Sequence, residues 1–154
     1  MEIVVNERLL DYLRPDAKVE EKDLAIKFIN AWVKKCDKIV IRNDSPFTRK
    51  FYEYRGQAEQ YAASRKHFRK LFELLILNSD KTRILNDCDI SEIPEDLAGK
   101  VPSDDKYLIE LWRSVPSSIV VTTDADLRDK LLEYDSSAKI YLLEEFLMSY
   151  VSDK

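Results

Sequence analysis

The sequence predicts an α/β fold, in the form of a three-layer α/β/α sandwich around a central, mainly parallel sheet of four to five strands. Two observations lead to this prediction. Short apolar runs without polar alternation, above all residues 119–123, are typical of strands that are covered on both faces. Helical spacing of apolar residues fills the stretches between these runs, and such alternation favours βαβ crossovers and a parallel sheet. With no linker or repeat to divide it, the chain 1–154 is expected to form a single domain.

The N-terminal part begins with a short strand over the apolar residues 3–5. A short helix with apolar residues at positions 9, 10 and 13 follows, and Pro15 ends it because its ring removes a donor and restricts the preceding residue. Apolar residues recur at mostly helical spacing over residues 21–35, which predicts a longer helix. Residues 38–42 form the second predicted strand.

The middle of the chain is predicted to be mainly helical. Ser45 is expected to be the N-cap of a helix and Pro46 its first residue. Helices are predicted over residues 47–55 and 57–78, and a short third strand over residues 83–86. The stretch 87–102 is acidic, contains proline and lacks periodicity, so it is expected to be a loop with at most one helical turn.

The last third of the chain resumes the alternation of helix and strand. A helix over residues 105–114 ends before Pro116, and the strand over residues 119–123 follows. The remaining predicted elements are a helix over 127–134, a strand over 139–143 and a helix over 144–151.

Composition excludes several classes of function. No apolar run approaches the roughly 20 residues that cross a bilayer, and the N-terminus lacks a basic region followed by an apolar stretch, so a cytoplasmic protein without membrane contact is expected. Gly56 and Gly99 are the only glycines, which excludes the two common Gly-rich phosphate loops. A zinc site of the usual kind is excluded because Cys36, Cys88 and His67 are the only cysteines and histidine, and both thiols are expected to be buried and reduced.

Carboxylates gather at two predicted junctions. Asp124 and Asp126 directly follow the strand over residues 119–123, and Asp104 and Asp105 open the helix before it. Open α/β sheets bind ligands beyond the carboxyl ends of their strands, so these side chains are candidates for a metal site. A structural interpretation is equally simple: Asp105 would be an ordinary N-cap and Asp124 an ordinary turn residue.

Three segments of the chain resemble the C-terminal half of a PIN domain. They are Pro102-Ser-Asp-Asp-Lys-Tyr-Leu-Ile-Glu-Leu-Trp112, Ile119-Val-Val-Thr-Thr-Asp-Ala-Asp-Leu127 and Lys139-Ile-Tyr-Leu-Leu-Glu-Glu-Phe-Leu147. The family pattern is an Asp that opens a helix, a strand that ends in Thr-x-Asp-x-Leu or -Phe, and a last strand that leads into an acidic and aromatic helix start. In the N-terminal half the order matches as strand, two helices, strand and a helix that carries a Glu, here Glu53.

The resemblance implies a metal-dependent ribonuclease. PIN nucleases hold one or two Mg²⁺ or Mn²⁺ ions with three or four carboxylates at one edge of the sheet. The physical need is independent of the family, because clustered carboxylates repel and a hard divalent cation relieves that repulsion. Carried over to this chain, the resemblance makes Asp105 (or its neighbour Asp104), Asp124 and Glu53 the catalytic and ligand candidates, with Asp126 as an auxiliary ligand.

One position departs from the family pattern. The first strand of an active PIN domain normally ends in an Asp, whereas this chain has Asn6, which can coordinate a metal through its carbonyl oxygen but brings no charge. Glu7 follows and could reach the site only if the end of the strand bends. The resemblance therefore leaves two alternatives, an active nuclease and a catalytically impaired PIN-like module that binds RNA or a protein partner without cleavage.

A cluster of basic residues in the helical middle is the candidate for RNA contact. It is interleaved with aromatic residues, so it could follow a phosphate backbone while rings stack on unpaired bases. The alternative is a solvated helix face with its aromatics buried. The candidate residues for contact with single-stranded or structured RNA are Arg49, Lys50, Arg55, Arg65, Lys66 and Arg69.

Three functions remain as hypotheses from the sequence. The first is a PIN-type ribonuclease, as the toxin of a toxin–antitoxin pair (with the antitoxin as partner) or as an RNA-processing factor. The second is the impaired PIN-like module, and the third is an unrelated α/β domain whose carboxylates are caps and turns. Because PIN domains commonly dimerise, a homodimer is expected.

Overall fold

A single five-stranded sheet forms the centre of the protein. In the computed structural model, which describes residues 1–57 and 65–152, all neighbouring strands are parallel and their order is β3-β2-β1-β4-β5. The sheet confirms the predicted α/β class with a parallel sheet. Its strands are β1 (Glu2–Val5), β2 (Lys38–Arg42), β3 (Thr82–Leu85), β4 (Ile119–Thr122) and β5 (Ile140–Leu142).

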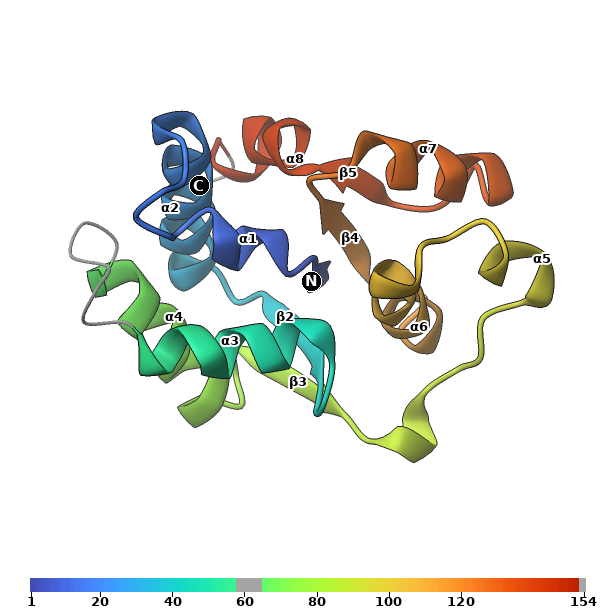
Figure 1. Cartoon of the computed structure of the whole chain (residues 1–154), viewed down its shortest axis with the longest axis horizontal. Coiled ribbons are helices and arrows are strands. Elements are labelled where there is room, and N and C mark those ends of the chain that lie inside the picture. The colour runs from blue at the N-terminus through green and yellow to red at the C-terminus, as the bar shows by residue number, and fades with distance from the viewer. Residues whose placement is uncertain (58–64, 153–154) are drawn as a thin grey trace.

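Helices cover both faces of the sheet, which makes the fold a three-layer α/β/α sandwich. On one face α6 (Lys106–Ser114) packs on β1, β2 and β4, and α7 (Ala125–Tyr134) packs on β4 and β5. The opposite layer contains α2 (Val19–Lys34), which contacts both α4 (Arg65–Leu77) and α8 (Leu143–Tyr150). Figure 1 shows α2 and α6 on opposite sides of the strands. Among the described residues, no helix has the length and apolar character needed to cross a bilayer.

The remaining helices are short or lie at the edge of the sheet. Helix α1 (Arg8–Asp11) follows the end of β1 and packs against α3 (Pro46–Gly56), which begins beyond the end of β2. Ser45 caps α3 as predicted, because its Oγ accepts the backbone N–H of Thr48 at 3.2 Å. The acidic stretch between β3 and α6 contains α5 (Glu95–Ala98) and two short 3-10 turns. The helix predicted over residues 57–78 is seen from Arg65 onward as α4, and residues 58–64 lie outside the described part of the chain.

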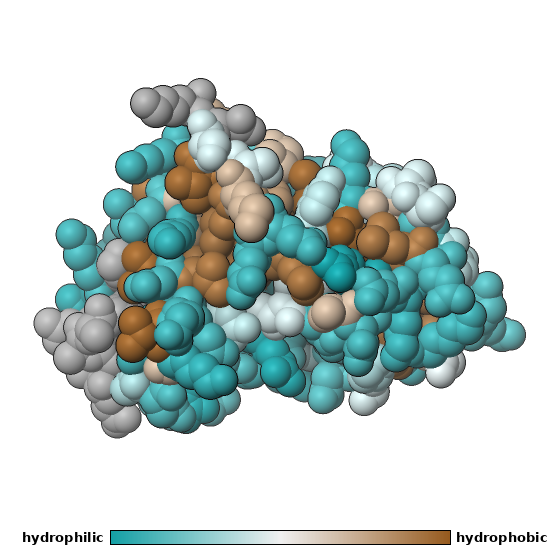
Figure 2. Space-filling view, turned by 90° about the horizontal axis from the view of Figure 1, so that it is seen from above, coloured by the Kyte–Doolittle hydropathy of each residue, from teal (hydrophilic) through white to brown (hydrophobic). Residues whose placement is uncertain are grey.

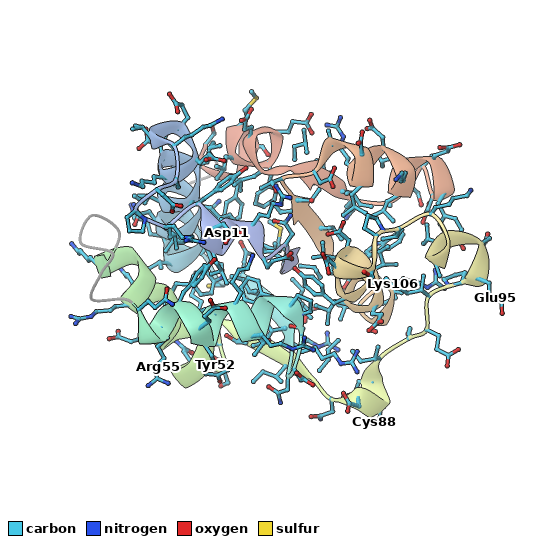
Figure 3. All side chains as sticks on the ribbon, viewed as in Figure 1. Asp11, Tyr52, Arg55, Cys88, Glu95 and Lys106 are labelled. Carbon is cyan, nitrogen blue, oxygen red and sulfur yellow. The ribbon has the colours of Figure 1, made fainter. Side chains whose placement is uncertain are left out.

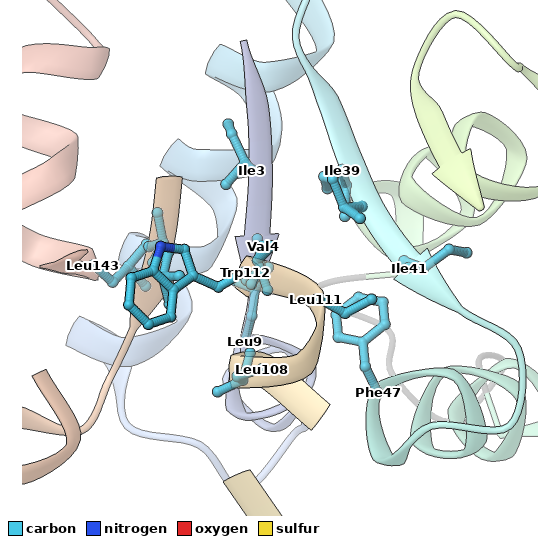
Figure 4. Close-up of a cluster of buried hydrophobic side chains, with 14 of the residues drawn as sticks. Ile3, Val4, Leu9, Ile39, Ile41, Phe47, Leu108, Leu111, Trp112 and Leu143 are labelled. Atoms are coloured by element: carbon cyan, nitrogen blue, oxygen red, sulfur yellow. The ribbon is translucent and has the colours of Figure 1, made fainter. Parts of the chain in front are cut away.

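The core is built on β1, whose residues are apolar on both faces because both faces are covered. Ile3 and Val4 are completely buried, and the neighbouring strand β2 contributes Ile39. Figure 4 shows Leu108 and Trp112 of α6 lying across the sheet next to β1. Removing this apolar surface from water, at roughly 25 cal/mol per Å², is the main source of stability for such a sandwich.

Polar contacts join the elements at the amino edge of the sheet. The Asp37 carboxylate accepts hydrogen bonds from the N-terminal ammonium at 2.5 Å and from the Tyr150 hydroxyl at 2.8 Å. Lys81 is buried, which lowers the pKa of its ammonium. Its Nζ donates to the main-chain oxygen of Trp32 at 2.6 Å and to that of Lys35, so it satisfies carbonyls at the C-terminus of α2.

The expectation of buried thiols is wrong. Cys36 and Cys88 are both exposed. Cys36 lies in the bend between α2 and β2, and Cys88 lies in the 3-10 turn that follows β3. Connecting segments run over the surface, so their position in the fold outweighs the usual preference of cysteine for the interior.

The contact made by Lys81 predicts a stability effect. Replacing Lys81 by Met should lower the free energy of unfolding by about 1–3 kcal/mol, because the carbonyls of Trp32 and Lys35 lose the ammonium as a donor and Trp32 keeps only the Lys35 N–H within the described residues. Urea unfolding followed by circular dichroism measures this change. Lys34→Met, at an exposed position of the same helix, is the control and should stay within about 0.5 kcal/mol of the wild type. Equal losses in both variants would contradict the role of Lys81.

Candidate functional site

The candidate site lies where the carboxyl ends of β1 and β4 meet. The two strands are paired in register, with Val5 opposite Val121, and the Asn6 N–H extends the ladder to the Val121 carbonyl at 3.2 Å. The chain continues from β1 to β2, toward one edge strand of the sheet, and from β4 to β5, which is the edge strand at the other end of the strand order. Open α/β sheets commonly bind their ligands at such a switch in direction.

Asn6 joins the two strand ends through its side chain. It is buried, and its Nδ2 donates to the hydroxyl oxygens of Thr123 at 3.1 Å and Thr122 at 3.4 Å. The same Thr122 oxygen accepts the backbone N–H of Asp124 at 3.1 Å, so Asn6 and Asp124 share a partner. The Oδ1 atom of Asn6 makes no hydrogen bond within the described part of the chain. Asn6 therefore lies in the site with an uncharged oxygen available.

Glu7 is held by a tyrosine of α6. The Tyr107 hydroxyl donates to Glu7 Oε2 at 2.5 Å and accepts the backbone N–H of Glu7 at 2.8 Å. Burial and then the charge of Glu7 raise the pKa of Tyr107 well above its ordinary value. In the sequence, Tyr107 is only one apolar-face residue of a predicted helix, and nothing in its spacing indicates that its hydroxyl fixes Glu7. This pair is the part of the site that the sequence did not predict.

The negative charges of three other carboxylates affect the pKa of Asp105. It is half-buried at the start of α6, and its pKa is raised first by burial and then by the charges of Glu7, Asp124 and Asp104. Arg8 opposes this rise with the smallest contribution. Asp105 occupies the N-cap position of α6, yet its side chain makes no capping hydrogen bond. The charge of Asp105 is thus incompletely compensated by its surroundings.

Asp124 caps a helix, whereas the structural interpretation expected a turn residue here and an N-cap at Asp105. Its Oδ1 accepts the backbone N–H groups of Asp126 at 2.9 Å and Leu127 at 3.3 Å at the start of α7. Its Oδ2 makes no hydrogen bond within residues 1–57 and 65–152. One oxygen of Asp124 therefore stabilises the helix, and the other is available to a ligand.

The structure brings some predicted site residues together and separates others. Asn6, Asp105 and Asp124 converge, with Asp104 beside them. Asp126 is exposed in the first turn of α7. Glu53 is exposed on α3, and its charge is not among those that act on Asp105, so its role as a ligand stays a prediction. In the described part of the chain, no group of three or more His, Cys, Asp or Glu side chains is arranged to hold a metal ion.

Two of the predicted RNA-contact residues are engaged within the protein. Arg49 pairs with Asp44 at 2.9 Å. Lys50 pairs at 2.8 Å with Asp11, whose other oxygen accepts the Tyr54 hydroxyl at 2.5 Å, and burial followed by this contact raises the pKa of Tyr54 to about 12. These two cations are therefore less available to a phosphate backbone.

The other cations of the predicted set lie toward the outside. Figure 3 shows Arg55 and Tyr52 pointing outward from α3. Lys66 and Arg69 are exposed on α4 and line an open hollow together with Lys70 and Glu73. The side chain of Arg65 lies outside the described part of the chain. On α4, Lys66 and Arg69 therefore stay candidates for contact with RNA.

Loss of the Tyr107 hydroxyl should destabilise the protein. In Tyr107→Phe the Glu7 carboxylate and its backbone N–H lose a partner beside a buried ring, at a cost of about 1–2 kcal/mol in the free energy of unfolding. Chemical denaturation measures this cost. Tyr134→Phe removes a hydroxyl from an exposed tyrosine and is the matched control, expected to be neutral. A neutral Tyr107→Phe would show that Glu7 is not held by this contact.

Removal of the Asp105 charge should stabilise the protein. The folded-state pKa of Asp105 is raised above its ordinary value of 3.8, so its ionisation weakens the folded state as pH rises from that value through the folded pKa. Asp105→Asn should therefore raise the melting temperature at pH 7, without divalent metal, by up to about 2 °C, a small effect because solvent screens the charges. The difference should vanish below pH 3.8, where the carboxyl is protonated in both states. Asp23→Asn, at an exposed position of α2, is the control, and a lower melting temperature for Asp105→Asn would contradict the interpretation.

Comparison with known proteins leaves the resemblance to PIN domains as a prediction. No protein-family model, curated protein or solved structure matches the chain. A function is therefore inferred from the side chains that meet at the ends of β1 and β4.

Proposed function

We propose that the chain is a metal-dependent ribonuclease of the PIN type, with its site at the carboxyl ends of β1 and β4. The observation that carries this proposal is the convergence of Asn6, Asp105 and Asp124 at the strand ends, where burial and then the charges of Glu7, Asp124 and Asp104 raise the pKa of Asp105. Mutual repulsion of this kind weakens the folded state and is relieved when a divalent cation binds between the groups. A cluster of carboxylates that repel one another is expected in a metal-binding site, whereas helix caps and turns do not require such a cluster.

The order of elements supports the same proposal. Asp105 opens α6, β4 leads through Thr123 into Asp124, and β5 leads directly into α8, which begins with an acidic turn followed by Phe146. This is the order that the PIN resemblance implies for the C-terminal half. The N-terminal half also has the expected order of strand, two helices, strand and a helix that carries Glu53.

The available donors fit a hard divalent cation. Asp105, Oδ2 of Asp124 and Oδ1 of Asn6 are oxygen donors, and Mg²⁺ is usually bound by one or two carboxylates while it keeps several waters. When bound, the ion would lower the pKa of a coordinated water and offset charge on the phosphoryl group under attack. The roles of the chain are to hold the ion, through Asp105 and Asp124, and to fix the strand ends, through Asn6.

A catalytically impaired PIN-like module is the second candidate, and Asn6 favours it. This buried amide contributes no negative charge at the position where an active PIN domain normally has an Asp. The function of such a module would then consist in binding RNA or a protein partner, such as an antitoxin or a second copy of the chain. Figure 2 shows patches of apolar side chains on the face seen from above the view of Figure 1. Val19, Tyr141 and Met148 are among the large apolar residues that are exposed. Partner, homodimer and cytoplasmic location stay predictions.

Manganese titration tests the nuclease proposal. The wild type should bind Mn²⁺ with micromolar affinity in calorimetry and cleave single-stranded RNA only when metal is present. Asp124→Asn should bind at least about tenfold more weakly and lose cleavage, while its fold is kept because Asn is also a good N-cap. Asp126→Asn, which changes an exposed neighbour in the same turn, is the matched control. No binding up to millimolar Mn²⁺ together with no cleavage would exclude the enzyme.

Asn6→Asp separates the two candidates. The substitution adds a carboxylate beside Asp105 and Asp124, so the metal-free protein should become less stable and its Mn²⁺ affinity should rise by about tenfold. If the chain is an impaired module, cleavage should appear only in this variant. If the wild type is an active nuclease, both proteins should cleave RNA. A variant that folds and binds Mn²⁺ no better than the wild type would show that Asn6 does not lie in the metal site.

A further inference from the structure

A second feature lies at the opposite edge of the sheet, at the amino ends of β4 and β5. A cavity of about 300 Å³ is formed there between the segment that follows α6 and the turn that joins α7 to β5. Trp112 is a large apolar residue of its lining, and the polar lining residues are Arg113, Ser117, Ser118, Asp135, Ser137 and Lys139. Because β4 and β5 separate this cavity from the carboxyl ends of the strands, it is not part of the candidate metal site.

Two buried polar atoms of the cavity lining lack a partner. Arg113 Nε and Ser118 Oγ are enclosed and make no hydrogen bond with any described residue. Ser118 as a whole is only 1% exposed. Nearly all buried polar atoms in proteins are hydrogen-bonded, so two such atoms in the lining of one cavity suggest that a ligand can bind there. Arg Nε can only donate and a serine hydroxyl can donate, so the group that would satisfy both is an acceptor.

The charges around the cavity show which kind of acceptor fits. Arg113 and Lys139 form no ion pair within residues 1–57 and 65–152. The one carboxylate of the lining, Asp135, is engaged in its own turn, where its Oδ1 accepts the backbone N–H of Ser137 at 3.0 Å and the Ser137 hydroxyl at 2.6 Å. These bonds lower the pKa of Asp135, so it stays ionised, and two cations face one anion. The local excess of positive charge favours a negatively charged acceptor.

We propose that this cavity binds a small oxyanion, a phosphate or a carboxylate group, through Arg113 and Ser118. A guanidinium presents neighbouring N–H donors that match two oxygens of such a group, and Lys139 adds a second positive charge to the lining. The two orphaned atoms have almost no surface in contact with solvent. An anion would therefore reach them only after exposed side chains of the lining, such as Ser137 and Lys139, have moved.

Titration with inorganic phosphate and with acetate, each in the absence of divalent metal, tests the proposal. At least one of the two anions should bind saturably to the full chain in calorimetry, and which one binds tells whether a phosphate or a carboxylate is preferred. Arg113→Lys keeps the charge but removes the Nε–H donor, and Ser118→Ala removes the hydroxyl, so each should weaken binding about tenfold or more. Ser136→Ala, at an exposed position of the same turn outside the lining, should bind like the wild type. Asp124→Asn should also bind normally, so the outcome is independent of the nuclease proposal.

Thermal unfolding provides a second readout. Without anion, Ser118→Ala should melt at the same temperature as the wild type or higher, because it removes a buried hydroxyl that has no partner. With saturating anion, the wild type should gain several degrees and Ser118→Ala should not. A lower melting temperature of anion-free Ser118→Ala would show that the hydroxyl is already satisfied, by an ordered water, and would overturn the proposal. Absence of binding up to millimolar phosphate and acetate, or equal binding by all variants, would overturn it as well.

Discussion

The position of β1 in the middle of a parallel sheet is the constraint on which the rest of the structure depends. Its residues Ile3, Val4 and Val5 are buried between two layers of helices, and the strand pairs with β2 on one side and β4 on the other. Its register places Ile3 opposite Ile39 of β2 and Val5 opposite Val121 of β4. Since parallel neighbours end at the same edge, the pairing with β4 alone is enough to bring Asn6 next to Thr122 and Asp124.

The carboxylates at that edge combine stabilising and destabilising effects. Asp124 stabilises α7 by accepting N–H groups at the positive end of the helix dipole, and Glu7 is fixed by a buried tyrosine. Asp105 gains no comparable bond and is repelled by its neighbours. A chain selected for stability alone would not need a half-buried, uncompensated carboxylate at this place. Proteins commonly keep such locally unfavourable groups where they bind ligands, and this is the physical reason for regarding the edge as a site.

Local patterns in the sequence predicted where the helices and strands lie in the chain. They did not predict which of these elements and side chains are in contact. The apolar runs located all five strands, and Ser45-Pro46 predicted the start of α3, because these signals depend on neighbouring residues only. The order of the strands, the contact of Tyr107 with Glu7 and the exposure of Cys36 and Cys88 depend on residues far apart in the chain. Asp124 shows the limit most clearly. A turn role and ligand binding were the alternatives for this residue, whereas one of its oxygens caps α7 and the other makes no hydrogen bond within the described residues.

The pairing of β1 with β4 also has a consequence for the way the chain folds. Asn6 and Thr122 touch across a separation of 116 residues, so the two halves of the candidate site come from opposite ends of the sequence. Contacts of such long range form slowly, because a large loop has to close before they contribute stability. During synthesis, β1 emerges long before its partner and can at first pair only with β2. The two strand ends that form the candidate site can therefore meet only after β4 has left the ribosome.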